Sequence, residues 1–181
     1  MNKIKVIKTV DNFEREYKYS VSLGGGIPLA EREFIIYQWY FPLDDGKEVK
    51  IKLVLDFVTL TEKWVRVSKK RVSHFEAEKK IEYLDPETID ISGFIGMPFV
   101  CKRRSIFGGI HLDRFVISNQ RCKYLLENEG EDKDIEDFCR RLSIEVERDV
   151  SADFGFRNIN LCTVFSGYHA KNLYFMLDVL H

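Results

Sequence analysis

The chain has 181 residues, of which 45% are hydrophobic and 13% aromatic; this is enough apolar side chain for one ordinary core and excludes a disordered polymer. Although 31% of the residues are charged, the net charge is only −1, so we expect neither DNA nor a membrane as a partner. The cysteines lack zinc-site spacing and the N-terminal stretch is too charged for a signal peptide. We therefore expect one cytoplasmic domain over residues 1–181.

Apolar and polar residues alternate with a period of two along most of the chain, a pattern typical of β-strands. In chain order, strands are predicted over Phe13–Val21, Gln38–Phe41, Val49–Phe57, Lys63–Val72, His74–Tyr83, Phe99–Phe107, Ile110–Ile117 and Lys123–Glu129. Short helices are predicted from Asp85-Pro86 and over Asp132–Leu142, whereas Leu161–His181 fits either a helix or a strand. The pattern favours an α+β, mostly β fold with a few flanking helices, in which consecutive antiparallel strands form a closed or nearly closed β-barrel.

Residues two apart in a strand share a face, and on that basis charged side chains fall on one face of each strand. These faces carry Glu14, Glu16 and Lys18; Lys50 and Lys52; Arg66, Ser68 and Lys70; Glu76, Glu78 and Lys80; Lys102 and Arg104; His111 and Asp113; and Glu127 and Glu129. One charged face is usually solvated, but like charges at this spacing repel unless a bound ion offsets them. Pairs of acids and pairs of bases therefore predict a metal cation and a polyanion.

A barrel interior lined by these faces would contain both requirements of phosphoryl transfer. Lysine and arginine bind phosphate oxygens and neutralise the charge that develops in the transition state. Carboxylates hold Mg²⁺ or Mn²⁺, hard cations that prefer oxygen ligands and lower the pKa of a bound water. Such an interior would be too costly when dry, so we expect a wet lumen that binds charged ligands.

Short motifs in this order resemble the CYTH superfamily, also called triphosphate tunnel metalloenzymes. The N-terminal signature Glu-x-Glu-x-Lys corresponds to Glu14-Arg15-Glu16-Tyr17-Lys18. The segments that follow are Gln38-Trp39-Tyr40, Lys50-Ile51-Lys52, Val67-Ser68-Lys69-Lys70, Glu76-Ala77-Glu78, Lys102-Arg103-Arg104, Leu112-Asp113-Arg114-Phe115, Glu127-Asn128-Glu129 and a tail from Val150 to Asn158. The resemblance covers residues 13–158. It implies an eight-stranded antiparallel closed β-barrel that forms a tunnel, a triphosphate substrate and a required divalent metal, Mg²⁺ or Mn²⁺.

The resemblance also assigns roles to individual side chains. The implied metal ligands are Glu14, Glu16, Glu127 and Glu129. Glu76 and Glu78 would be further ligands or would position a second metal. Asp113 would be another metal ligand or would orient a basic neighbour. The implied triphosphate-binding residues are Lys18, Lys50, Lys52, Arg66, Lys70, Lys102 and Arg104. The implied catalytic residues are Lys18, Glu127, Glu129 and Tyr40, the last paired with Lys18. The chain departs from the family pattern at Lys50, Lys52 and His111, and the choice between Lys69 and Lys70 rests on alternation alone.

Three functions are consistent with these residues. The first is metal-dependent hydrolysis of a triphosphate: tripolyphosphate, thiamine triphosphate or a nucleoside triphosphate. The second is a class IV-type adenylate cyclase; those cyclases carry a His-Phe pair upstream of the signature, and no histidine occurs in Ile4–Phe13. The third is a non-catalytic module that binds polyanions, which would need the bases but not three pairs of glutamates. We expect a small-molecule triphosphate as the partner and leave a monomer or a homodimer open.

Overall fold

The structure, a computed structural model, describes residues 4–26, 28–42, 47–129 and 135–180. Its strands are β1 (Val6–Leu23), β2 (Arg32–Tyr40), β3 (Glu48–Asp56), β4 (Thr61–Arg71), β5 (Glu76–Leu84), β6 (Pro98–Phe107), β7 (Ile110–Ile117), β8 (Tyr124–Glu129), β9 (Ile144–Asp149) and β10 (Thr163–Val164). The helices are α1 (Ile135–Arg141) and α2 (Gly167–Leu180), with single 3₁₀ turns η1 (Pro86–Thr88), η2 (Ile91–Phe94), η3 (Phe154–Phe156) and η4 (Asn158–Leu161).

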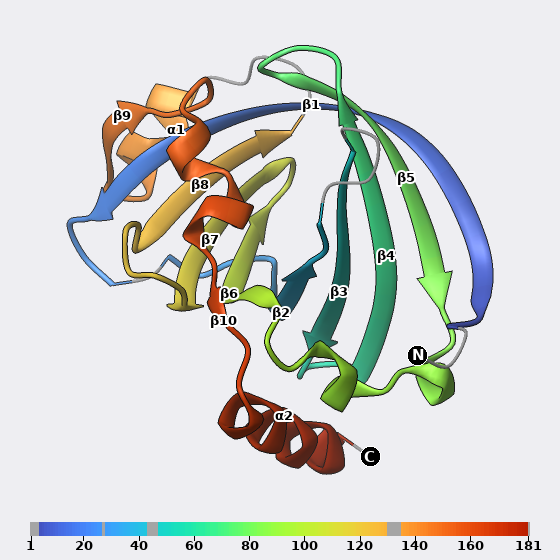
Figure 1. The fold of residues 1–181 in the computed structure, drawn as a ribbon. Helices are drawn as coiled ribbons and strands as arrows, with labels where there is room; N and C mark the ends of the chain where they lie inside the picture. Colours follow the sequence, from blue (N-terminus) through green and yellow to red (C-terminus); the bar gives the residue numbers. More distant parts are fainter. Residues whose placement is uncertain (1–3, 27, 43–46, 130–134, 181) are drawn as a thin grey trace.

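Eight of these strands close into a barrel. Their order around the ring is β6-β2-β3-β4-β5-β1-β8-β7, and pairing of β7 with β6 completes the closure (Figure 1). Neighbouring strands run antiparallel, while β9 pairs with β1 and β10 with β6 as additions to the ring. The predicted fold is confirmed: a mostly β, α+β protein built on an eight-stranded antiparallel barrel.

The first strand is longer than the sequence pattern predicts. Its N-terminal part, from Val6 to Arg15, pairs with β5, and the part from Glu16 to Ser20 pairs with β8. The C-terminal part, from Tyr19 to Leu23, also pairs with β9, so β1 forms a long arc across one end of the barrel (Figure 1). This arc carries the Glu-x-Glu-x-Lys run from the edge of β5 to the edge of β8.

The largest apolar cluster lies on the outer face of the barrel, beneath α2. Trp39 on β2 is fully buried and stacks on Trp64 of β4 at 5.8 Å between ring centroids. Phe165, just before α2, meets the same indole edge-on at 5.3 Å, and Leu173 of α2 belongs to this cluster. Because α2 covers these apolar side chains from outside, the alternate residues of the same strands point into the barrel. Leu161–His181, which fits either structure in sequence, is therefore mainly a helix over its described part.

Of the two predicted helices, one is present over its described part and the other is reduced to a single turn. α1 begins at Ile135, and residues 132–134 of the predicted helix lie outside the described residues. Its predicted stripe is confirmed in part, since Ile135, Phe138 and Cys139 are buried. The segment at Asp85-Pro86 forms only a 3₁₀ turn, in which the Asp85 side chain accepts from the N–H of Glu87. No described helix has the length and apolar character required to cross a bilayer.

Candidate functional site

The barrel interior is lined almost entirely by polar and charged side chains. The lining comprises Glu14, Glu16, Lys18, Gln38, Glu48, Lys50, Lys52, Val67, Lys69, Arg71, Lys79, Lys102, Arg104, Glu127, Glu129, Arg157 and Asn158. These described lining residues include nine bases and five acids, so the lumen carries an excess of positive charge. These side chains nearly fill the space that they enclose and leave a cavity of about 30 Å³.

Nine of the predicted site residues meet in this lumen. They are Glu14, Glu16, Lys18, Lys50, Lys52, Lys102, Arg104, Glu127 and Glu129. Strand register explains the proximity of β1 and β8, because Glu16 lies opposite Glu129 and Lys18 opposite Glu127. In the ring of eight strands, β3 and β8 lie four positions apart in either direction, so Lys50 and Lys52 face the glutamates of β8 across the lumen.

The expected orientation of β4 is wrong. Arg66 and Lys70 were expected in the lumen, but they share an outer face with Trp64, whose packing against Trp39 fixes which face of the strand points outward. Arg66 Nε lies 2.5 Å from Oε2 of Glu82 on the neighbouring strand, and Lys70 is exposed. The side chain of Lys69 takes the expected place of Lys70 in the lumen.

The same correction applies to β5. Glu76 forms an ion pair of 2.5 Å with Arg15 near the surface, and Glu78 is exposed beside Lys70 on the outer face. In its place Lys79 points inward, where Nζ lies 2.8 Å from Oε2 of Glu14. Antiparallel pairing with β4 imposes this result, because opposed residues share a face and Lys70 lies opposite Glu78. Neither Glu76 nor Glu78 is placed to bind a metal in the lumen.

Three carboxylates gather where β1 meets β8. Glu14, Glu16 and Glu129 each offer an oxygen within 4.8 Å of the other two. Lys69 Nζ lies 2.5 Å from Glu14 and 3.5 Å from Glu16. Burial by itself would raise the pKa of Glu14, but the ammonium groups of Lys69 and Lys79 outweigh it and lower this pKa. The result is an all-oxygen donor group, which suits a hard divalent cation such as Mg²⁺ or Mn²⁺.

A second network joins β1, β6, β7 and β8. Asp113 is fully buried; Arg104 donates to it twice, through Nε and Nη2, each at 2.7 Å, and Lys102 donates to it as well. Glu127 accepts from Lys18 Nζ at 2.7 Å and also from Arg104. Asp113 therefore orients two bases, the second of the two roles expected for it. Burial opposes the charge on Lys18, but Glu127 and Glu16 outweigh it and raise the pKa of this ammonium group.

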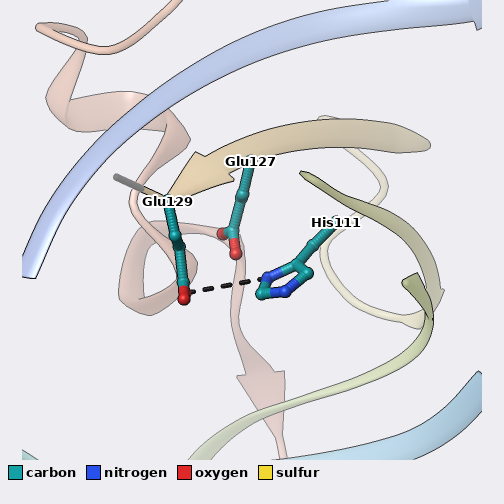
Figure 2. A group of neighbouring side chains, drawn as sticks. All are labelled: His111, Glu127 and Glu129. Atoms are coloured by element: carbon teal, nitrogen blue, oxygen red, sulfur yellow. Dashed lines mark ion pairs between the residues drawn. The ribbon is translucent and has the colours of Figure 1, made fainter. Parts of the chain in front are cut away.

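His111 on β7 lies beside Glu127 and Glu129, the two glutamates of β8, as Figure 2 shows. Its Nδ1 atom is 3.7 Å from Oε1 of Glu129 and 3.2 Å from Nη1 of Arg104. A guanidinium group only donates, so Nδ1 is the acceptor. Because the guanidinium group of Arg104 fills the space between these three side chains, they leave no room for a metal cation.

Tyr40 is in the barrel wall but does not bond to Lys18 as expected. Its hydroxyl donates to Oε1 of Gln38 at 3.2 Å, and its ring lies under the Lys50 ammonium group, 5.3 Å from the centroid. Burial, followed by the charge of Glu48, raises the pKa of Tyr40 well above its ordinary value. The neutral phenol is thus a hydrogen-bond donor that holds Gln38 and supports Lys50.

Lys52 has no hydrogen bond or ion pair with any residue in the described ranges, although it lies inside the barrel. Burial lowers the pKa of its ammonium group, and the charges of Lys50, Lys79 and Arg104 lower it further, to well below the ordinary value. A buried ammonium group that faces other cations is costly unless an anion offsets it. This part of the lumen is therefore suited to an anionic ligand.

Sequence reasoning missed several lumen residues. Glu48, Lys69, Arg71, Lys79 and Arg157 line the cavity without having been predicted to do so. For Glu48 the alternation rule contained the signal, because it shares a face with Lys50 and Lys52, and its side chain accepts from Lys50 at 2.9 Å. Arg157 lies after η3 in an irregular segment, where no periodicity predicts the direction of a side chain.

Comparisons with known proteins add little to this description. No family model matches the chain, and no curated protein matches it in sequence. Among solved structures, it is similar to "The crystal structure of the hypothetical protein NE1496", with 16% identity, a TM-score of 0.42 and coverage of 84% of this chain and 99% of that one. A likeness at this level carries no argument about function, which therefore has to come from the lumen itself.

Proposed function

We propose that the protein is a divalent-metal-dependent triphosphatase that hydrolyses a phosphoanhydride bond inside the barrel. The observation that carries this proposal is the distribution of charge within one lumen. The carboxylates of Glu14, Glu16 and Glu129 gather on one wall, and the opposite wall carries Lys50 and Lys52. A chain of phosphates with bound metal matches both walls, since its oxygens meet the lysines and its cation meets the carboxylates.

The bases would bind the triphosphate and neutralise charge as the reaction proceeds. Burial and neighbouring cations hold the pKa of Lys52 well below its ordinary value, so a bound anion would stabilise its charged form. Lys50 lies on the same face of β3. Arg104 and Lys102 are held in place by the buried Asp113, so they would not need to reorganise during the reaction. Fixed charges in a site that excludes bulk water stabilise a transition state more strongly than mobile ones.

Glu14, Glu16 and Glu129 would hold the metal, with Glu127 close to them on β8. When bound there, a divalent cation would supply charge neutralisation and a more acidic water. The carboxylates now pair with Lys69, Lys79 and Lys18. Binding of metal and substrate would exchange these internal ion pairs for pairs with the ligands: lysine to phosphate and glutamate to cation.

A panel of substrates tests the proposal. The purified protein is incubated with tripolyphosphate, thiamine triphosphate and ATP, with Mg²⁺ or Mn²⁺ and with or without a chelator, and orthophosphate, pyrophosphate and cyclic nucleotide are measured. We expect metal-dependent release of orthophosphate from at least one substrate. Pyrophosphate together with cyclic AMP from ATP would indicate the cyclase instead, and tight binding without any product would indicate the binding module. Orthophosphate release that is unaffected by the chelator would contradict the proposed dependence on a divalent metal.

A further inference from the structure

The outward face of α2 carries a stripe of large apolar side chains. One side of this helix packs on the barrel cluster, where Leu173 and Leu180 are buried. On the side turned away from the barrel, Tyr168, Phe175 and Val179 are 72%, 69% and 64% exposed. A contiguous apolar stripe on an element that is already anchored is typical of an interaction surface. The helix is therefore amphipathic toward the barrel and apolar again toward solvent.

The spacing of this stripe is that of a coiled-coil seam. Tyr168, Asn172, Phe175 and Val179 follow one another at intervals of four, three and four residues. Asn172 and Val179 thus occupy a positions, and Tyr168 and Phe175 occupy d positions. An isolated helix of 14 residues would be marginal in water, but the barrel holds α2 in place, so little ordering remains to be done when a partner helix binds.

The charges beside the seam identify the partner. Lys171 and Asp178 are both exposed, both lie at g positions of the same frame, and neither has an ion pair within the described part of the chain. In an antiparallel helix pair g faces g, so a two-fold axis would set Lys171 of each copy opposite Asp178 of the other. In a parallel pair g meets e, which here is His169 or Met176, packed toward the barrel. The charge pattern is therefore complementary to itself in the antiparallel orientation.

We propose that this face of α2 binds a second copy of the chain, with the two helices packed antiparallel about a two-fold axis. Phe175 of each copy then packs against Asn172 of the other, and Tyr168 packs against Val179. The two Asn172 side chains lie within one turn of each other beside the axis, close enough to form a hydrogen bond. A single polar residue at an a position fixes the register of such a pair.

The area of the stripe sets the strength that we expect. A large aromatic side chain buries 150–250 Å², so the exposed parts of Tyr168, Phe175 and Val179 amount to on the order of 400 Å² per copy. With Asn172 and the charged flanks, the pair would bury about 1,000 Å² in total, at the low end of specific interfaces. The dimer should thus dissociate in the micromolar range. This inference is independent of the proposed function.

Sedimentation of the untagged full chain over about 1 to 300 µM tests the inference. The mass should rise with concentration from 21.3 kDa toward twice that value. Phe175→Ser should weaken association by at least about tenfold, because the ring lies at the centre of the seam. Phe13→Ser is the matched control, since Phe13 is a 55% exposed ring on β1, away from α2, and should leave association unchanged. A monomer at every concentration, or a dimer that Phe175→Ser leaves intact, would overturn the inference.

Charge reversal tests the orientation of the two helices. Lys171→Glu and Asp178→Lys each set like charges opposite one another, so each variant alone should associate at least about tenfold more weakly than the unmodified protein. An equimolar mixture of the two restores both ion pairs across the axis and should associate as the unmodified protein does. A mixture that stays monomeric would contradict the antiparallel pairing. No outcome depends on phosphate release, so the proposed function can fail or succeed separately.

Discussion

Lys18 Nζ lies 2.7 Å from Oε1 of Glu127, so the base of the N-terminal Glu-x-Glu-x-Lys run is paired with an acid of the last strand of the ring, 109 residues away in sequence. The pairing of β1 with β8 produces this contact, because Lys18 and Glu127 are opposed in register. Glu127 is also bonded to Arg104 and is almost fully buried. One carboxylate thus neutralises two bases that would otherwise repel each other inside the barrel.

Replacing Glu127 with glutamine keeps the shape of the side chain and removes its charge. Two buried cations lose their common partner, so we expect turnover to fall roughly a hundredfold, as for the loss of one preorganised electrostatic group. We also expect a lower melting temperature, since removing one partner of a buried ion pair is destabilising. Phosphate release and thermal unfolding measure the two effects. Glu76→Gln is the control, because Glu76 pairs with Arg15 near the surface, and an equal loss in both variants would contradict the assignment.

Lys69 and Lys70 are adjacent in sequence but lie on opposite faces of β4. Lys69 contacts Glu14 and Glu16 in the lumen, whereas Lys70 is exposed on the outer face. We expect Lys69→Met to weaken triphosphate binding by the ~1.5–3 kcal/mol typical of a hydrogen bond to a charged group. Lys70→Met should change binding by less than about 0.5 kcal/mol, as for most surface substitutions. Titration calorimetry with tripolyphosphate compares the two, and a larger effect at Lys70 would mean that β4 faces the other way.

The sequence predicts the inner faces correctly where one face of a strand is plainly apolar. On β3, Ile51 and Leu53 are core residues, so Lys50 and Lys52 have to point into the barrel. On β4 both faces carry apolar residues: Trp64 packs outward, while Val67 lines the lumen. Only the contact of Trp64 with the distant cluster beneath α2 decides between them. Alternation within one strand contains no information about that packing, which is why the orientation of β4 could not be predicted.

The inner face of β5 was also predicted wrongly, for a different reason from that of β4. Its charges fall on both faces, since Lys79 points inward while Glu78, Lys80 and Glu82 lie on the outer face. A same-sign pair such as Glu76 and Glu78 resembles a metal-binding motif in sequence, and Arg15 on the neighbouring strand satisfies Glu76 instead. Pairing between strands, rather than spacing within one, determines which charges meet in the lumen.

Glu48 should make part of the stability dependent on pH. Burial would raise its pKa, but the ammonium group of Lys50 outweighs it and lowers this pKa from 4.5 to about 2. Glu48 therefore takes up a proton at a higher pH in the unfolded chain than in the folded protein. Its contribution to the free energy of unfolding is present above its pKa in the unfolded chain and is lost as pH falls through its pKa in the folded protein. Urea unfolding should show a difference between the unmodified protein and Glu48→Gln of up to about 3 kcal/mol at neutral pH.

The pH dependence of the difference between the unmodified protein and Glu48→Gln tests this prediction. As the pH falls from 4.5 toward about 2, the difference in unfolding free energy between them should shrink progressively. Glu87→Gln is a suitable control for the substitution itself, because Glu87 is exposed on the η1 turn and lies outside the lumen lining. A difference that stays constant over this range would show that the ion pair between Glu48 and Lys50 does not contribute to stability through its charge.

We expect Lys52 to link the binding of an anionic ligand to proton uptake. In the free protein, burial and the neighbouring cations hold its pKa well below 10.5. Phosphate oxygens beside the ammonium group would raise this pKa again, so at any pH between the two values binding takes up a proton. Affinity should therefore be greatest below the pKa of the free protein and should fall as pH rises through the interval. Calorimetry with tripolyphosphate in two buffers of different ionisation enthalpy measures the uptake directly, and equal enthalpies in both buffers at every pH would contradict it.

In Lys52→Arg, which stays protonated because arginine has a pKa above about 12, the uptake and the pH dependence from this position should both disappear while binding persists.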